Sequence, residues 1–164
     1  MSETTRPNRF ETLPEMKLAG VREAFAFEAS IAHIPEMWKR FTPQWPLPGQ
    51  NGTVAYGAMC GVHDEGRTLE YIAAVEVASF DDLPTDLGRM IVPAARYAVF
   101  RHEGDAWTLP DTWARAINDW LPLSNFDDRE TPAFERFAAD FDHRHGTGLV
   151  EIFLPVVEAE SAPA

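Results

Sequence analysis

The chain has 164 residues, 45% of them hydrophobic and 24% charged, so it is long enough to bury the core of one domain. Its formal net charge of −12 argues against binding to nucleic acid or to an anionic membrane surface. The single cysteine, Cys60, excludes an internal disulfide, and the polar start MSETTRPNRF lacks the apolar run of a signal peptide. We therefore expect a cytoplasmic protein without a membrane segment, with flexible tails at 1–9 and 158–164.

The first half of the chain predicts a strand, a helix and two further strands. The opening strand is expected at 15–25. A helix is expected from about Ile31, with Pro35 near its start, because apolar residues there recur at three- or four-residue steps. Strands at 53–62 and 69–77 follow a turn-rich stretch and form a hairpin. The apolar helix face consists of Ile34, Trp38, Phe41 and Trp45.

The second half predicts the same order of elements after a connector at 79–89. A strand is expected at 90–104, with a proline near its start. The helix that follows opens at 109–111, where a proline is well placed for a first turn. Two more strands are expected within 132–141 and 148–156.

A repeat with an offset of 75 residues relates the two halves. Two pairs of tryptophans coincide at this offset, Trp38 with Trp113 and Trp45 with Trp120. Because tryptophan is rare, two matches at one offset indicate a duplicated β-α-β-β module. We therefore predict one α+β domain at 10–157 with pseudo-twofold symmetry, whose halves span about 13–78 and 89–157.

Two glutamates interrupt apolar strands at matching positions of the repeat. Glu76 lies in YIAAVEV and Glu151 lies in LVEIFLPV. Because side chains alternate across a strand, Glu151 shares a face with Leu149 and Phe153, opposite the aliphatic face that a helix would cover. Both glutamates would then project from the side of the sheet away from the helices.

Two interpretations of these glutamates stay open. Their face is solvated, or they pair with arginine, in which case they are ordinary polar residues. Alternatively, carboxylates within an apolar surface form a receptor for a hydrophobic cation, where desolvation raises the carboxyl pKa and permits proton transfer. The apolar companions of Glu151 and Glu76 favour a groove shared by both.

Five segments resemble the GyrI-like small-molecule-binding domain, which is also the effector-binding domain of many AraC-type and MerR-type bacterial transcription regulators. The similarity extends over about residues 10–157. The segments are LPEMKLAGV (13–21), IVPAARYAVFRHEG (91–104), WARAINDWLPLSNF (113–126), PAFERF (132–137) and VEIFLPV (150–156).

The resemblance implies an antiparallel sheet with two helices on one face and a ligand groove near the symmetry axis. In the family this groove commonly binds bulky aromatic, often cationic compounds against a glutamate. The glutamate of the family's VEIWIPV-type strand falls on Glu151, and that of its FExY motif falls on Glu135. The tyrosine of FExY is Phe137 here, and the usual serine-glycine is Ser124-Asn125, followed by Phe126 rather than tyrosine.

Aromatic residues supply the other candidates for the groove. Trp45 and Trp120, at the helix ends, are expected to line it, with Tyr56 and Met59 as a wall. Trp38 and Trp113 fit the core, and Trp107 a rim. The candidate ligand-binding residues are therefore Glu151, Glu76, Phe153, Tyr56, Trp45, Trp120, Met59 and Glu135.

No cofactor or metal is expected. The pair His143 and His145 lacks further ligands, so it is interpreted as a solvated turn. The regulators carry a DNA-binding helix-turn-helix segment that this chain does not contain, so direct DNA binding is not expected.

Three functions remain open on this scaffold. The first is a non-enzymatic receptor for lipophilic, cationic or aromatic small molecules. The second is a hydrolase of reactive electrophilic natural products, with Glu151 or Glu76 as general acid or base. The third is a protein-interaction role such as gyrase inhibition. The protein would be a monomer or a homodimer.

Overall fold

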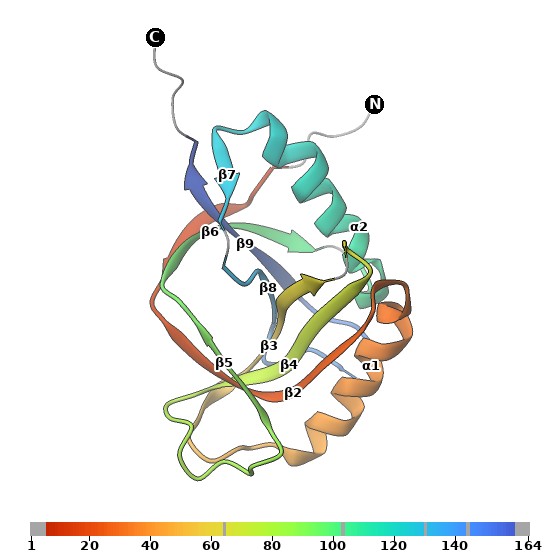
Figure 1. The fold of residues 1–164 in the computed structure, drawn as a ribbon, viewed down its shortest axis with the longest axis vertical. Helices are drawn as coiled ribbons and strands as arrows, with labels where there is room; N and C mark the ends of the chain where they lie inside the picture. Colours follow the sequence, from red (N-terminus) through yellow and green to blue (C-terminus); the bar gives the residue numbers. More distant parts are fainter. Residues whose placement is uncertain (1–5, 64, 103, 130, 144, 160–164) are drawn as a thin grey trace.

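The computed structural model describes residues 6–63, 65–102, 104–129, 131–143 and 145–159. Two helices cover one face of a strongly curled antiparallel sheet, as Figure 1 shows. This arrangement confirms the predicted α+β class with both helices on one side. None of the described helices is both long and apolar enough to cross a membrane.

Each half supplies one helix and its share of the sheet. The first half contains β1 (Arg9–Leu13), β2 (Met16–Ala26), α1 (Ser30–Phe41), β3 (Gln50–His63) and β4 (Thr68–Val77). The second contains β5 (Gly88–Val92), β6 (Ala95–His102), α2 (Leu109–Ala114), β7 (Phe126–Asp128), β8 (Phe134–Phe137) and β9 (Val150–Glu158). Short 3-10 turns flank the helices at Phe27–Ala29, Thr42–Gln44, Ala106–Thr108 and Leu121–Leu123.

The sheet runs in the order β1-β6-β9-β8-β3-β4-β2-β5, and β7 pairs with the far end of β9. Its two ends belong to one ladder. In β1–β6, Leu13 lies opposite Ala95, and in β2–β5, Met16 lies opposite Val92. Leu13 and Met16 are three residues apart in the chain, and so are Val92 and Ala95. The register is therefore the same on both sides of the gap between the two strand pairs. The ends of the sheet therefore meet, and the strands form the ring visible in Figure 1.

The opening strand of each half is split, which the sequence did not indicate. The predicted strand at 90–104 is two strands, β5 and β6, separated by Pro93 and Ala94. Pro14 lies in the corresponding gap between β1 and β2. A proline has no N–H to donate to a ladder, so each interruption falls where the chain loses a donor. Each half thus contributes its first segment to the opposite half.

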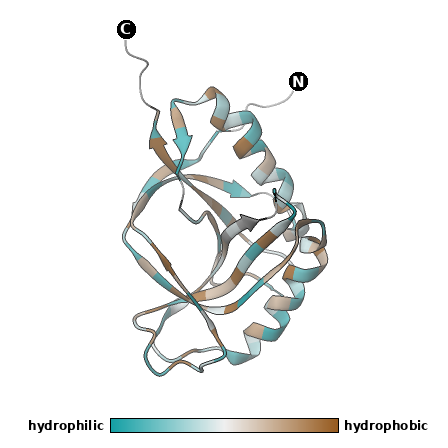
Figure 2. Ribbon diagram, in the orientation of Figure 1, coloured by the Kyte–Doolittle hydropathy of each residue, from teal (hydrophilic) through white to brown (hydrophobic). Residues whose placement is uncertain are grey.

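Side chains of alternate residues form two separate apolar layers, as expected for strands with period two. Val75, Val150 and Ile152 face the helices and pack with residues such as Trp38 and Phe41. The opposite side, inside the curl, holds a second cluster that includes Ile72, Tyr97, Phe134 and Phe153. Figure 2 shows hydrophobic and hydrophilic residues alternating along the strands. The face predicted to hold the two glutamates is thus itself wrapped around a core.

The helices differ in their details from the prediction. Pro35 lies inside α1, which begins at Ser30 directly after a 3-10 turn. The second helix opens at Leu109 as expected, but after Ala114 it continues as a π-helical segment, Arg115–Trp120. Such π-helical turns are rare in proteins, and those that occur often lie at functional sites.

The N-terminal tail is shorter than the predicted 1–9. Arg9 belongs to β1, and Asn8 exchanges hydrogen bonds with the backbone of Val99 and Arg101. These contacts hold the chain against β6, so the ordered domain begins before residue 10. Residues 1–5 and 160–164 lie outside the described part of the chain.

Candidate functional site

Glu135 lies on the helix-facing side of the sheet and is almost completely buried. It occupies β8 between Gly57 on β3 and Ile152 on β9, and 6% of its surface is exposed. The Tyr71 hydroxyl donates a hydrogen bond to its Oε1 over 3.2 Å, and the Trp113 indole N–H donates to its Oε2 over 3.0 Å. Each carboxylate oxygen therefore has one neutral donor.

Gly57 makes room for this arrangement. A Cβ atom at position 57 would lie 1.9 Å from the Tyr71 hydroxyl oxygen and 3.0 Å from Glu135 Oε1. Any other residue would displace the phenol from the carboxylate. The glycine is therefore required by close approach, since its backbone lies directly beneath the hydrogen bond.

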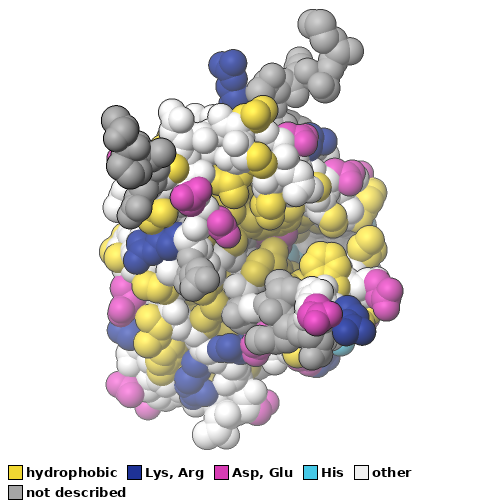
Figure 3. Space-filling model, turned by 45° about the horizontal axis from the view of Figure 1, so that its top comes forward, with side chains coloured by type: hydrophobic (Ala, Val, Ile, Leu, Met, Phe, Trp, Pro, Cys, Tyr) yellow, Lys and Arg dark blue, Asp and Glu magenta, His cyan; other side chains and the backbone are white. Residues whose placement is uncertain are grey.

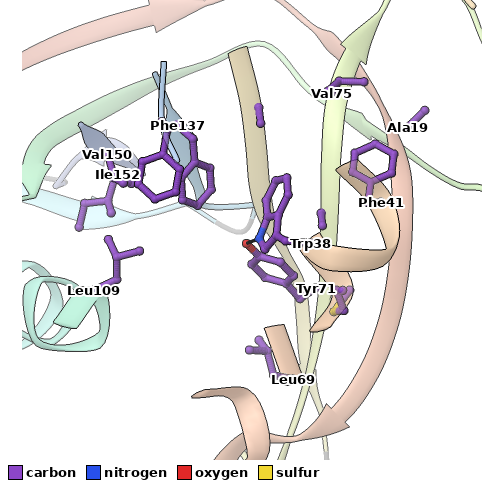
Figure 4. Packing of buried hydrophobic residues seen from close by; sticks show 14 of the residues in the cluster. Ala19, Trp38, Phe41, Leu69, Tyr71, Val75, Leu109, Phe137, Val150 and Ile152 are labelled. Carbon is purple, nitrogen blue, oxygen red and sulfur yellow. Dashed lines mark hydrogen bonds between the residues drawn. The ribbon is translucent and has the colours of Figure 1, made fainter. Parts of the chain in front are cut away.

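Trp38 and Trp113, one of the two tryptophan pairs matched by the 75-residue repeat, enclose the Tyr71–Glu135 pair. Trp38, on α1, donates its indole N–H to the Tyr71 hydroxyl over 3.3 Å. Trp113, on α2, donates to Glu135 from the other side. Figure 4 shows the Trp38 ring beside Tyr71 of β4, with Phe137 on β8, on the other side of β3. One chain of hydrogen bonds thus runs from α1 across the sheet to α2.

The electrostatics of Glu135 are unusual for a glutamate. Burial raises the pKa of Glu135 to about 7, although the hydrogen bonds from Trp113 and Tyr71 oppose the rise. Within the described part of the chain, no ionised group contributes to this pKa. A buried carboxylate without a cationic partner is costly in free energy, so the position favours either a proton or a positively charged guest.

His143 lies in an aromatic cluster beside this network, contrary to the predicted solvated turn. Its ring stacks on Trp38 with a centroid distance of 4.5 Å and contacts Trp45 edge-on at 5.6 Å. Burial lowers the pKa of His143 to about 4, so the imidazole is neutral at pH 7. The Trp45 indole N–H is buried without a hydrogen-bond partner among the described residues. Only His145 occupies an exposed turn, where it binds Asp142.

Glu151 lies on the opposite face and is paired with arginine. Arg136 contacts its Oε1 over 3.0 Å, and Arg9 binds both carboxylate oxygens. The Arg9 guanidinium holds the pKa of Glu151 below its usual range, although partial burial opposes this. The Arg136 guanidinium also lies 4.6 Å from the centroid of the Phe153 ring. A cavity of about 260 Å³ beside the pair is lined in part by Arg136, Leu149 and Glu151.

Glu76 is on the same side of the sheet as Glu151, as the alternation predicts. It lies half-buried opposite Leu18 on β2. Its charge adds to the effect of burial in raising the pKa of Tyr56. Tyr56 and Phe153 belong to the core inside the curl, where both pack against Phe134. These four candidates are therefore on the face away from Glu135.

The remaining apolar candidates, Trp45, Met59 and Trp120, lie on the helix side. Trp45 and Met59 pack against the helix-side core. Trp120 packs against Phe100 and lines a separate surface hollow of about 470 Å³ together with Phe10 and others. Sequence reasoning placed Trp113 in the core and did not single out Tyr71 or Gly57. The signal that could have identified Trp113 is its match to Trp38 in the repeat.

Figure 3 shows hydrophobic side chains gathered in a hollow near the centre of one face, with charged groups around it. Taken with the carboxylate between two tryptophan-bearing helices, the fold and site define an α+β small-molecule-binding module. The model of the family described as "GyrI-like small molecule binding domain" matches residues 7–157. The chain belongs to this family, which confirms the resemblance seen in the sequence.

Comparison with known proteins agrees with this assignment. The transcriptional regulator BrlR of Pseudomonas aeruginosa is 27% identical over 129 residues, which cover 75% of this chain and 46% of BrlR. The chain thus spans about half the length of this curated relative.

Two solved structures show the same fold. The structure of SAV2435 bound to tetraphenylphosphonium matches with a TM-score of 0.68 at 18% identity, covering 91% of this chain and 93% of that chain. A hydrolase encoded by lin2189 from Listeria innocua matches with a TM-score of 0.51 at 12% identity, covering 94% and 93% of the two chains.

Proposed function

We propose that this protein binds bulky lipophilic cations, with Glu135 as the anionic anchor. The observation that carries the proposal is a buried carboxylate whose hydrogen-bond donors, Tyr71 and Trp113, are both neutral. A cation beside Glu135 would supply the missing charge, and desolvation would strengthen that attraction. Tetraphenylphosphonium, the ligand of the SAV2435 structure, has the corresponding chemistry.

The aromatic residues around Glu135 suit this class of ligand. Trp38, Trp45, Trp113 and His143 lie on the helix side of the sheet near the carboxylate network. Their rings provide apolar area and electron-rich faces for a cation with aromatic substituents. Opening of the space between the helices would give such a ligand access to Glu135.

Glu151, the other candidate anchor, has a different role in this proposal. Because Arg9 and Arg136 already neutralise it, a cationic ligand would have to displace an arginine to bind there. We assign Glu151 to stabilising the curled sheet, since Arg9 on β1 and Arg136 on β8 meet at this residue of β9.

The test is a titration with tetraphenylphosphonium, followed by tryptophan fluorescence. Glu135→Gln is expected to weaken binding at pH 8 by about tenfold or more, corresponding to the loss of one buried charge interaction. Glu151→Gln is expected to leave the affinity within about twofold. The reverse order of effects would move the anchor to the other face of the sheet.

A hydrolase is the second candidate, favoured by the pKa of Glu135 near 7. A carboxyl group that titrates close to neutral pH can act as a general acid or base. The residue expected to act is then Glu135 rather than Glu151 or Glu76. Incubation with electrophilic, strained-ring compounds followed by mass spectrometry decides this, because a hydrolase yields a water adduct that the Glu135→Gln variant does not form.

A further inference from the structure

We propose that a cationic ligand and a proton compete for Glu135, so that binding of a lipophilic cation releases a proton from this side chain. The inference rests on the proposed function of the same site. It adds that the affinity for cations is coupled to pH, and that neutral aromatic ligands are taken up without proton release.

The geometry of Glu135 provides the first argument. The Glu135 residue is 6% exposed, so water contributes little to stabilising its charge. Its donors, the Tyr71 hydroxyl and the Trp113 indole, stabilise a carboxylate only in part because neither carries a charge. The empty site therefore holds either a neutral acid or a carboxylate with uncompensated charge.

The neighbours from each surrounding element provide the second argument. α1 contributes Trp38 through Tyr71 of β4, and α2 contributes Trp113. β3 contributes Gly57 and β9 contributes Ile152 opposite Glu135. Among these described neighbours there is no side chain with a permanent charge.

The segment after β8 brings one further titratable group near the network. His143 stacks on Trp38, and burial lowers its pKa to about 4. It is therefore neutral between pH 5.5 and 8.5, as its pKa requires. The charged Glu151 and Arg136 lie on the other face of the sheet and neutralise each other. Among the residues that the structure describes, no neighbouring charge can replace the ligand as the partner of Glu135.

The O–H bond of the Glu135 carboxyl breaks, the proton passes to solvent or buffer, and the carboxylate forms an ion pair with the incoming cation. Since the pKa of Glu135 is about 7, about three-quarters of the sites are protonated at pH 6.5 and about a tenth at pH 8. Well below pH 7, the Kd for a cation is expected to rise about tenfold for each unit by which the pH falls. Well above pH 7, the Kd is expected to be constant.

The experiment is isothermal titration of the whole chain with tetraphenylphosphonium at pH 6.5 and at pH 8. Each titration is repeated in phosphate and in imidazole, which differ strongly in their enthalpy of protonation. The difference in heat between the two buffers is expected to correspond to about 0.8 proton released per ligand bound at pH 6.5. At pH 8 it is expected to correspond to about 0.1 proton. Triphenylphosphine oxide, a neutral analogue, is expected to show no buffer dependence.

Variants separate Glu135 from other groups. Glu135→Gln, which cannot ionise, is expected to abolish both the proton release and the pH dependence of the remaining affinity. Glu158→Gln, the same chemical change at the exposed end of β9, is expected to retain both. Proton release that persists in Glu135→Gln would overturn the assignment.

The two proposals fail in different ways. Binding of tetraphenylphosphonium with equal affinity at both pH values and no buffer-dependent heat would overturn the proton exchange alone. Absence of binding at both pH values would overturn the proposed function and the exchange together.

Discussion

Trp38 and Trp113 stand 75 residues apart in the chain, yet their indole N–H groups enter one buried network from opposite sides. Trp38 reaches the Tyr71 hydroxyl from α1, and Trp113 reaches the Glu135 carboxylate from α2. The duplication placed equivalent tryptophans on both helices, but among the described residues a single carboxylate, that of Glu135, joins the network between them. The site is therefore asymmetric, although the framework that carries it is pseudo-symmetric.

Glu135→Gln should stabilise the empty protein at pH 8. The folded pKa of about 7 exceeds the ordinary 4.5, so the folded state holds its proton more tightly than the unfolded chain does. Stability consequently falls as pH rises from about 4.5 to about 7 and is then level, with a total loss of up to about 3 kcal/mol. Urea denaturation should show the variant more stable by about 1–3 kcal/mol at pH 8, and a smaller difference at pH 5.

Tyr71→Phe should shift the titration of Glu135 upward. The phenol donates to the carboxylate and accepts from Trp38, so its removal takes away one stabiliser of the charge and leaves a buried indole N–H without this acceptor. We expect a loss of stability of about 1–3 kcal/mol. Affinity for tetraphenylphosphonium should fall more at pH 7 than at pH 9. An equal loss at both pH values would show that Tyr71 does not set the pKa of Glu135.

Gly57→Ala should force the phenol away from the carboxylate, because the new Cβ would lie 1.9 Å from the hydroxyl oxygen. We expect a destabilisation of about 2 kcal/mol or more, measured by chemical denaturation. Removing the hydroxyl relieves the shortest contact, so the Gly57→Ala and Tyr71→Phe changes should combine to less than their sum. Strict additivity would contradict a clash between these residues.

Glu151→Gln should destabilise the fold at neutral pH by about 1–3 kcal/mol, because it removes the shared partner of Arg9 and Arg136. The pKa of Glu151 is lowered in the folded state, so its contribution is present above the carboxyl's ordinary pKa and is lost as pH falls below it. The variant and the parent should therefore converge in stability under acid conditions. A difference that persists at low pH would indicate packing rather than charge.

His143→Phe should protect the protein from acid. The folded pKa of about 4 lies below the ordinary 6.5, so the unfolded chain takes up the proton first and stability is lost as pH falls from about 6.5 to about 4. Phenylalanine keeps a ring on Trp38 without a titratable group. Thermal unfolding between pH 4 and 7 should show a flatter decline in the variant. Because Glu135 acts in the opposite direction over part of this range, Glu135→Gln should show a steeper decline than the parent.

Several features of this protein were determined by the sequence alone. The 75-residue repeat, the alternation in YIAAVEV and LVEIFLPV and the helix starting with Leu109 are local or periodic patterns. They predicted the duplicated modules, the face on which Glu76 and Glu151 lie, and the second helix, because short-range periodicity decides which side of an element is apolar. The family resemblance also singled out Glu135 beside Glu151.

The tertiary structure decided which carboxylate is available. The pairing of Leu13 with Ala95 and of Met16 with Val92 curls the sheet until its ends meet, so the face that carries Glu151 surrounds a second core. Arg136 lies directly opposite Glu151 in the β8–β9 pair, and Arg9 reaches Glu151 from β1, two strands away in the sheet. Glu135 precedes Arg136, the cross-strand partner of Glu151, by one residue, so its side chain points to the opposite face and lies toward the helices. Pairing between distant strands has no signature in local periodicity, which is why the sequence indicated the candidate acids but not the one left without a cation.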